Sequence, residues 1–245
     1  MYTVLSEIRQ TILPDPDGPH GPLPPLLIAW TFVTGLVDAF SYLVLGRVFV
    51  ANMTGNVVFL GFALGGAPDF SILDSLIALV SFALGALAGG RLGSVLRDHR
   101  GKHVSAAATI QAALLAGSVV VAAISGPAIA AGYHLALIVL LAIAMGIQNA
   151  TARKLGVPDL TTTVLTLTIT GIAADSRIAG GNGAFAGRRL VALGAMLAGA
   201  LVGAALVLHV SVASPLVVAL ILAALIAITA RLWGSSDPAW VRPRT

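Results

Sequence analysis

The sequence has 245 residues, of which 58% are hydrophobic and only 10% are charged, and its mean hydropathy is +0.97. This composition excludes a soluble globular protein, because too few polar side chains are present to cover a water-exposed surface. The formal net charge is +4. We nevertheless expect no nucleic-acid binding, because the basic residues stand between apolar runs, where they orient membrane helices. The absence of cysteine excludes disulfides, thiolate metal sites and a catalytic thiol. The partner that composition predicts is the lipid bilayer.

The first long apolar run begins only after a segment with six prolines and two aspartates, residues 14–25. This arrangement does not fit a cleaved signal peptide, and the segment is expected to be a stiff linker. Ahead of it, residues 2–13 are expected to form either a short amphipathic helix on the membrane surface or a disordered tail. The apolar residues at helical spacing that suggest the helix are Val4, Leu5, Ile8 and Ile12.

Six runs approach the roughly 20 apolar residues that a helix needs to cross a bilayer. They are 23–45, 75–96, 104–125, 133–152, 190–210 and 215–233. Two shorter runs, 52–66 and 161–175, are rich in Thr, Gly and Asn, and each follows a break, at Gly46-Arg47 and at residues 156–159. We expect these two to be half-helices that enter the membrane and return.

Basic loops stay cytoplasmic, so the 14 Lys and Arg residues test this division. With six crossings and a cytoplasmic N-terminus, all of them except Arg47 lie on or near the cytoplasmic side. Eight crossings would split them evenly. Seven crossings, with the first short run spanning and the N-terminus outside, fit as well as six, so charge leaves six and seven open.

The two halves of the chain resemble each other. Residues 35–39 (GLVDA) align with residues 146–150 (GIQNA), Asp38 precedes Thr54 by 16 residues, and Asn149 precedes Thr166 by 17. The glycine pair Gly85 and Gly89 then matches the pair Gly199 and Gly203. With three crossings in each half, the second copy must enter from the opposite side, as in the inverted repeats of many secondary transporters.

We therefore predict an all-α polytopic membrane protein with six transmembrane helices and two short half-helices, arranged as two inverted repeats of three crossings. The expected parts are an N-terminal tail with a Pro-rich linker (1–22), the first repeat (23–125), the second repeat (126–233) and a C-terminal tail (234–245). Both termini are predicted to be cytoplasmic.

Asp38 is the first candidate for an ion or proton site, because a carboxylate inside an apolar run costs at least about 2.5–3.5 kcal/mol unless it faces a partner. The alternative is a structural acid that accepts hydrogen bonds from hydroxyls such as those of Ser41 or Thr34. In the second half, the neutral pair Gln148-Asn149 occupies the equivalent place.

Residues 52–56 are the most polar stretch expected at membrane depth. Thr54 or Asn56 is expected to cap the half-helix that follows, whose positive end would attract an anion or a substrate carboxylate. In the second half, Thr162, Thr166 and Thr170 recur every four residues and would share one helical face. That face either lines a permeation path or only bonds back to carbonyls one turn earlier.

The glycine pairs suit close packing of membrane helices, either within the chain or in a homodimer through glycine-rich faces. Trp30, Trp233 and Trp240 are expected to anchor the chain at the membrane interface. We expect no enzyme, because the chain contains neither an HExxH metal motif nor a GxSxG elbow. The sequence also predicts no cofactor and no metal site.

The stretches GLVDAFSYLVLGRVFVANMTGN (35–56) and GIQNATARKLGVPDLTTTVLT (146–166) resemble the YoaK-like family of uncharacterised bacterial transmembrane proteins. The resemblance covers about residues 25–233 and implies a membrane fold and a bacterial origin, but no particular activity. The expected location is therefore the bacterial inner (plasma) membrane. The family tends to have a second TG pair after the threonines, where this chain has Thr166-Leu167. The two half-helices are therefore not expected to bind identical groups.

Our leading hypothesis from the sequence is a small secondary transporter or permease for an unknown solute or ion, with a midplane site at the two broken helices. The candidate binding residues are Asp38, Thr54, Asn56, Gln148, Asn149, Thr162 and Thr166. The alternative is a non-transporting membrane scaffold or assembly factor, in which these polar residues satisfy one another.

Overall fold

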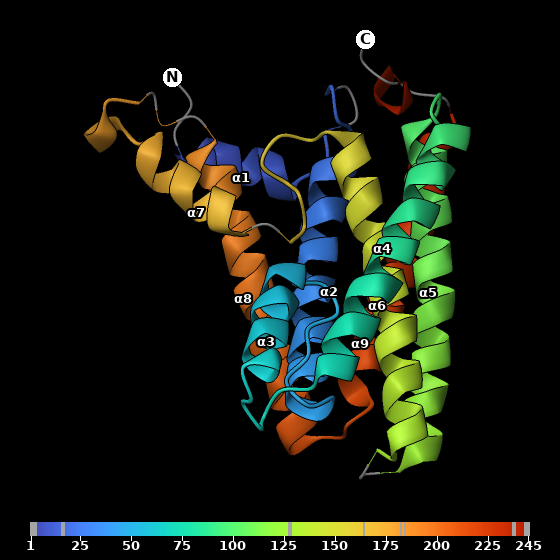
Figure 1. The fold of residues 1–245 in the computed structure, drawn as a ribbon. Coiled ribbons are helices and arrows are strands. Elements are labelled where there is room, and N and C mark those ends of the chain that lie inside the picture. Colours follow the sequence, from blue (N-terminus) through green and yellow to red (C-terminus); the bar gives the residue numbers. More distant parts are fainter. Residues whose placement is uncertain are drawn as a thin grey trace.

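The computed structural model describes residues 4–15, 18–126, 129–163, 165–181, 183, 185–236 and 239–242, and the regular structure in these ranges is helical (Figure 1). The helices are α1 (Val4–Ile12), α2 (Leu23–Val44), α3 (Met53–Leu64), α4 (Ile72–Val95), α5 (Arg100–Ser125), α6 (Ala131–Leu155), α7 (Leu165–Ala174), α8 (Ala186–His209) and α9 (Ser214–Gly234), with short 3-10 turns at Arg177–Ala179 and Ala239–Val241.

Six helices, α2, α4, α5, α6, α8 and α9, are long and apolar enough to cross a membrane. The shortest of them, α9, has 21 residues, which is about 32 Å at 1.5 Å per residue and matches a hydrocarbon core of about 30 Å. With 12 and 10 residues, α3 and α7 reach only about 18 and 15 Å. The six predicted spans and two half-helices are confirmed, and seven or eight spanning helices are not found in the described residues.

The long helices extend past the apolar runs that located them. The side chain of Ser71 accepts a hydrogen bond from the backbone N–H of Asp74 at 3.1 Å, so α4 begins three residues before its predicted start. At the other side of the bundle, α6 continues through two basic residues to Leu155 and ends at Gly156, whose φ of 61° is left-handed. Hydropathy locates the buried part of each helix, whereas caps fix its ends.

The N-terminal segment forms the amphipathic helix that was one of its two expected states. α1 packs against the start of α8, where the Glu7 carboxylate accepts a hydrogen bond from the backbone N–H of Gly187 at 2.8 Å. Glu7 thus supplies a cap that α8 lacks from its own preceding residue, Phe185. Leu5 stays 77% exposed, as suits a helix lying on a membrane surface.

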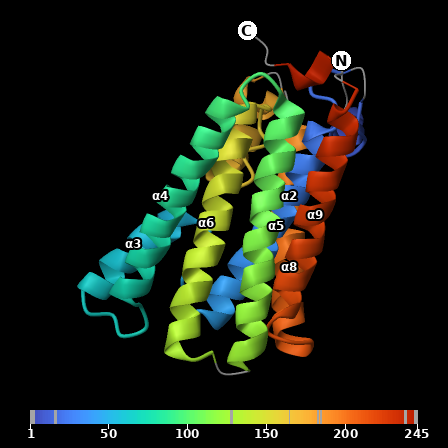
Figure 2. The ribbon, with the colours of Figure 1, turned by 90° about the vertical axis from the view of Figure 1, so that its right-hand side faces the viewer.

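The long helices pack in three close pairs, α2 with α8, α4 with α6, and α5 with α9 (Figure 2). In the first two pairs glycines allow backbone to touch backbone, since a Cβ atom at each of four positions would overlap a carbonyl oxygen of the facing helix. The glycines and the residues that carry these oxygens are Gly35 with Met196, Gly199 with Phe32, Gly146 with Phe82, and Gly85 with Ile143.

The predicted glycine pairs therefore serve packing within this chain, because Gly89 and Gly203 also lie against α6 and α2. Gly90 and Gly194 instead have open space around them. A homodimer through faces of that kind stays a prediction.

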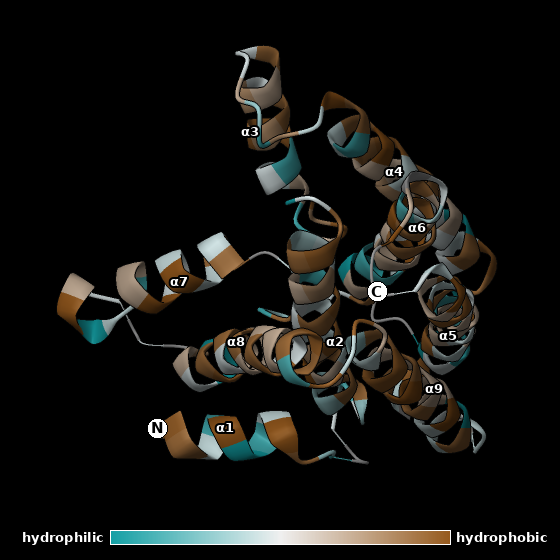
Figure 3. Ribbon diagram, turned by 90° about the horizontal axis from the view of Figure 1, so that it is seen from below, coloured by the Kyte–Doolittle hydropathy of each residue, from teal (hydrophilic) through white to brown (hydrophobic). Residues whose placement is uncertain are grey.

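At the centre of the bundle stand α2 and α6, in which 61% of the apolar segment is buried, against 17% in α8. These two helices carry Asp38 and Asn149. Viewed from below, α3 and α7 lie outside the packed long helices (Figure 3).

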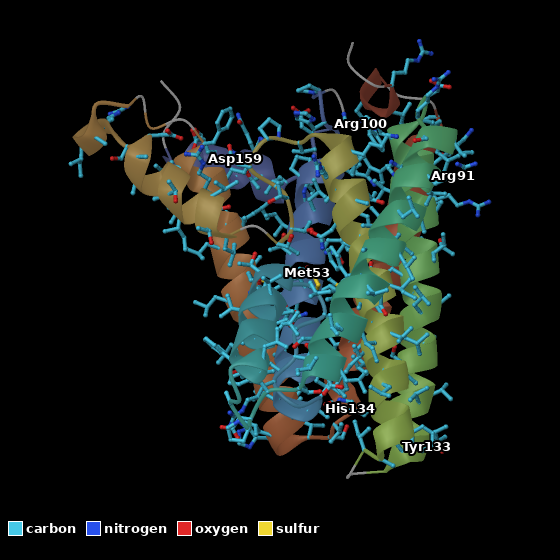
Figure 4. All side chains as sticks on the ribbon, in the orientation of Figure 1. Met53, Arg91, Arg100, Tyr133, His134 and Asp159 are labelled. Atoms are coloured by element: carbon cyan, nitrogen blue, oxygen red, sulfur yellow. The ribbon has the colours of Figure 1, made fainter. Side chains whose placement is uncertain are left out.

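One end of the bundle, where α2 begins and α4 ends, gathers the basic residues, including Arg91 and Arg100 (Figure 4). We refer to it as the basic end. At the opposite end lies Arg47, which pairs with Asp69 at 2.9 Å.

Candidate functional site

Two re-entrant hairpins interrupt the bundle, one from each end. In the first hairpin, residues 45–64, the chain leaves α2 at the end opposite the basic end, climbs back and returns as α3, so that Met53 lies near the mid-height of the bundle (Figure 4). The second hairpin, residues 156–174, leaves α6 at the basic end, dips into the bundle and returns as α7 (Figure 1).

Asp38 holds the first hairpin. It lies six residues, or about 9 Å, before the end of α2, and it is only 5% exposed. Its Oδ1 accepts hydrogen bonds from the backbone N–H groups of Val50 (3.2 Å) and Ala51 (2.9 Å), which directly precede α3. The carboxylate is therefore a partner for loop backbone that would otherwise be unpaired in the membrane.

The prediction that the hydroxyls of Ser41 or Thr34 donate hydrogen bonds to the Asp38 carboxylate is wrong. Ser41 donates to the backbone carbonyl of Asp38, and Thr34 donates to the carbonyl of Trp30. Both bonds stay within α2, as hydroxyls in membrane helices commonly do.

Asn56 closes the first hairpin from the other side. Its Oδ1 accepts from the N–H of Phe49 at 2.9 Å, and its Nδ2 donates to the carbonyl of Phe49 at 2.6 Å. The side chain is fully buried and pairs with both backbone groups of Phe49 as a neighbouring strand would, while its Nδ2 also donates to Sδ of Met53 at 3.7 Å. Asn56 thus fixes the turn against α3.

The expected capping of α3 by Thr54 or Asn56 is wrong, because both residues lie inside the helix and Asn52 occupies the cap position without a side-chain bond. Asn52 and Thr54 are instead exposed. The polar side chains of Asn52 and Thr54 are therefore exposed within one helical turn of the backbone N–H groups that Asp38 binds.

The second hairpin is held by Asn149, which aligns with Asp38 in the sequence. Asn149 lies six residues before the end of α6, again about 9 Å, and its Oδ1 accepts a hydrogen bond from the hydroxyl of Thr163. Its Nδ2 donates to the carbonyl of Met145 at 3.0 Å. An amide and a carboxylate at matching positions thus bind the two re-entrant segments.

The predicted threonine face does not form. Thr162 precedes α7 and has a left-handed backbone with φ 65°, so it does not share a helical face with Thr166 and Thr170, which are exposed on α7. The buried threonine of α7 is Thr168. Thr162 itself is 3% exposed, and its hydroxyl has no hydrogen-bond partner among the described residues.

Ion pairs fasten the base of each hairpin. Arg189 at the start of α8 binds Asp159 (2.8 Å) before α7 and Asp175 (2.7 Å) after it. In the first hairpin the pair of Arg47 and Asp69 flanks α3 in the same way, but its side chains are 49% and 64% exposed. The pair of Arg189 and Asp159 is the more buried one, with side chains 12% and 21% exposed.

Gln148 belongs to a separate buried network between α2, α5 and α6. Its Oε1 accepts from Nε2 of Gln111 at 2.6 Å, and its Nε2 donates to the hydroxyl of Thr34 at 2.8 Å. Gln111 in turn accepts from the indole N–H of Trp30 at 2.7 Å. These four side chains are at most 1% exposed.

Sequence reasoning missed Gln111, although an amide inside the apolar run of α5 carries the same signal that singled out Gln148. The expectation that Trp30 anchors at the interface is wrong, because its ring is fully buried and bonded to Gln111. Trp240 is buried as well, against Gly21 and Gly101.

The candidate residues thus fall into three groups. Asp38, Thr54 and Asn56 belong to the first hairpin, Asn149, Thr162 and Thr166 belong to the second, and Gln148 lies in the network between them. The described residues contain no group of three or more His, Cys, Asp or Glu side chains placed to hold a metal ion.

A family model described as "Protein of unknown function (DUF1275)" matches residues 26–229. The chain belongs to this family. The DUF1275 match runs from the start of α2 into α9, so it includes both hairpins and the Gln111–Gln148 network.

The chain is also similar to a Bacillus subtilis (strain 168) protein described as "UPF0700 transmembrane protein YoaK", with 37% identity over 151 residues. The alignment covers 61% of this chain and 65% of that protein, so it spans just under two thirds of the relative's length. No solved structure matches the chain. Together the two similarities confirm the predicted membership of a YoaK-like family and agree with a membrane protein.

Proposed function

We propose that this protein is a small secondary transporter or permease of the bacterial inner membrane, without enzymatic activity, and that a solute or ion passes beside the two re-entrant hairpins. The observation that carries the proposal is the exposure of Asn52 and Thr54, the two neighbours of Met53, which lies near the mid-height of the bundle (Figure 4). Exposed polar groups and irregular backbone are tolerated at that depth where they line a water-filled cavity, which favours a polar path.

We also propose that α2–α5 and α6–α9 form an inverted repeat, the arrangement from which many secondary transporters are built. Gly35 and Gly146 occupy equivalent positions, and each packs against the backbone of the second long helix of the other half. Three positions before these glycines, the backbone of Phe32 packs against Gly199 and the backbone of Ile143 packs against Gly85. The half-helices also run toward opposite ends of the bundle (Figure 1).

The basic end is assigned to the cytoplasm, since short loops rich in Lys and Arg are retained there. The described segments nearest the two termini, α1 and the turn at Ala239–Val241, lie at this end of the bundle (Figure 1), so both termini are cytoplasmic. The first hairpin then enters the membrane from outside and the second from inside, as expected for repeats of inverted topology.

The groups around α3 favour a polar neutral solute or a cation. The Asp38 carboxylate already binds the backbone N–H groups that precede α3, so a negative group stands at the positive end of this half-helix. A second anion there would be repelled. At the second hairpin, the unpartnered hydroxyl of Thr162 offers a polar contact that a solute or water would satisfy.

The second candidate function is a non-transporting scaffold or assembly factor. Asn56 and Gln148 favour it, because the hydrogen bonds of both side chains are made within the protein. The two functions differ in whether water reaches Asn52 and Thr54.

Cysteine accessibility tests this difference, because the chain has no cysteine of its own. We expect Asn52→Cys and Thr54→Cys in proteoliposomes to react with a charged, membrane-impermeant thiol reagent. The control Leu225→Cys, an exposed apolar position near the middle of α9, should not react. Solutes that slow the labelling of Thr54→Cys then become candidates for flux assays, in which Asp38→Asn is expected to transport less than wild type. If all three cysteines are equally unreactive, the transporter assignment is wrong and the scaffold remains.

A further inference from the structure

A cavity of about 660 Å³ opens at the basic end, between the last turn of α4, the first turn of α5 and the last turn of α6. It touches the second hairpin only at that hairpin's first residue, Gly156, and it is separate from the first hairpin and from the Gln111–Gln148 network. Three cationic side chains and one carboxylate line it together with two histidines. These residues are Arg97, Arg100 and Lys154, then Asp98, and His20 and His103.

Gly93 brings two of these groups together. A Cβ atom at this position would lie 2.6 Å from the His103 ring and 2.6 Å from Cδ of Lys154, so only glycine lets both side chains approach α4. His103 is 4% exposed and contacts the hydroxyl of Thr151 through Nε2 at 3.3 Å. The ammonium group of Lys154 donates to the hydroxyl of Ser94 at 3.0 Å. The wall of the cavity is therefore built from side chains that hold one another in place.

Arg100 fixes the remaining wall. Its guanidinium donates to the carbonyl of Leu155 at 2.7 Å and lies 3.4 Å from the carbonyl oxygens of Pro19 and Trp240. One cation thus joins the linker, the end of α6 and the C-terminal turn around the cavity. Arg97 at the rim pairs only loosely with Asp98, at 3.7 Å and with both side chains largely exposed.

We propose that this cavity binds a phosphate-bearing anion. The part of the ligand that is recognised is a phosphoryl group, which accepts charge-assisted hydrogen bonds from Lys154 and Arg97, beside His103. Such a group arrives either as the headgroup of an anionic phospholipid or as a soluble phosphate. Basic pockets between membrane helices at the cytoplasmic face bind lipid headgroups. The apolar side chain of Leu96 in the cavity wall is compatible with a lipid. The inference does not depend on transport through the hairpins.

The test uses the purified full-length protein in detergent and measures its thermal unfolding temperature. One arm titrates inorganic phosphate against chloride at constant ionic strength, and the other adds phosphatidylglycerol against phosphatidylcholine to the micelles. We expect Lys154→Ala to raise the half-saturating concentration of the stabilising probe about tenfold, because a charge-assisted bond is lost. The matched control is Arg153→Ala, which removes the same charge from the adjacent residue outside the cavity.

A second pair of variants keeps the proposal testable if Lys154→Ala fails to fold. Arg97→Ala should weaken binding, whereas Arg91→Ala on the same helix should not, because Arg91 does not line the cavity. Stabilisation by phosphate alone identifies a soluble anion, and stabilisation by phosphatidylglycerol alone identifies a lipid headgroup. The proposal is overturned if no probe stabilises the wild type, or if the cavity variants and their controls respond alike. Labelling of Asn52→Cys is unaffected by either result.

Discussion

Two polar side chains at membrane depth, Asp38 and Asn56, bind loop backbone groups that would otherwise lack a hydrogen-bond partner. Asn149 holds the other loop through a side chain, the hydroxyl of Thr163. Asn56 makes the most complete pairing, because it satisfies both the donor and the acceptor of Phe49. It is therefore the position at which the structural role of these residues is most easily measured.

Replacing Asn56 with alanine is expected to destabilise the protein. The change leaves the N–H and the C=O of Phe49 without partners, at about 1–3 kcal/mol for each buried group. The thermal unfolding temperature in detergent should fall clearly below that of wild type. Thr54→Ala, two positions earlier and exposed, should leave it nearly unchanged. Equal stability of the two variants would mean that Asn56 does not hold the hairpin.

The buried amides of Gln111 and Gln148 are expected to be energetically coupled. Removing one of them leaves the other with an unsatisfied group, whereas removing both leaves none at this contact. The double variant Gln111→Leu/Gln148→Leu should therefore lose less free energy of unfolding than the sum of the single variants. We expect a coupling of about 0.6–1.7 kcal/mol, the range of interhelical hydrogen bonds in membranes. Additive losses in this double-mutant cycle would contradict the network.

At the residue scale, the sequence could predict where polar groups are buried but not which atoms they meet. Asp38 was identified because a carboxylate interrupts an apolar run. Its donors, the N–H groups of Val50 and Ala51, depend on how the chain turns back after Gly46, and no local pattern encodes that path. The left-handed backbone of Thr162 could not be predicted from the sequence either, because threonine does not favour that conformation and only its surroundings impose it.

Glycine positions decide how closely the elements pack. Gly85→Ala on α4 is expected to lower the unfolding temperature, because the new Cβ would overlap the carbonyl oxygen of Ile143, and overpacking of this kind costs about 1–3 kcal/mol. The matched change Gly90→Ala on the same helix meets open space and should be neutral or stabilising by up to about 1 kcal/mol.

The same pair of changes on α8 tests the proposed repeat. Gly199→Ala should destabilise as Gly85→Ala does, because it meets the carbonyl oxygen of Phe32 in the equivalent way. Gly194→Ala, which has open space, is the control. If Gly199 tolerates alanine while Gly85 does not, the two interfaces are not equivalent and the repeat loses its main support.

At the element scale the sequence predicted more than it did at the residue scale. All six long helices and both half-helices lie where the apolar runs placed them, because the membrane demands a fixed length of apolar helix. The start of α7 is the exception, since it begins at Leu165 and leaves the first threonines in the loop. A threonine-rich sequence has no strong helix propensity that would fix this boundary.

The whole molecule is polarised, with a basic end and an opposite end where Arg47 lies beside Asp69. The positions of the basic residues fit six or seven crossings equally well, and helix lengths decide between them. The 12 residues of α3 are too few to span the membrane, so the number of crossings is six. Which face of the membrane each end meets then follows from the positive-inside rule alone, and it needs a direct measurement.

Single cysteines in the intact cell provide that measurement. We expect Ala67→Cys and Ser211→Cys, in the loops opposite the basic end, to be labelled by an impermeant thiol reagent added outside. Lys102→Cys and Ser235→Cys, exposed at the basic end, should be labelled only after the membrane is permeabilised. Lys102 is a better site than its neighbour Gly101, where a side chain would press on Trp240. Because an even number of spans separates Lys102 from Ser235 and an odd number separates either from Ala67, labelling of Ala67 and Lys102 from the same side would overturn six crossings. Labelling of the basic end alone from outside would keep the six crossings and reverse the orientation.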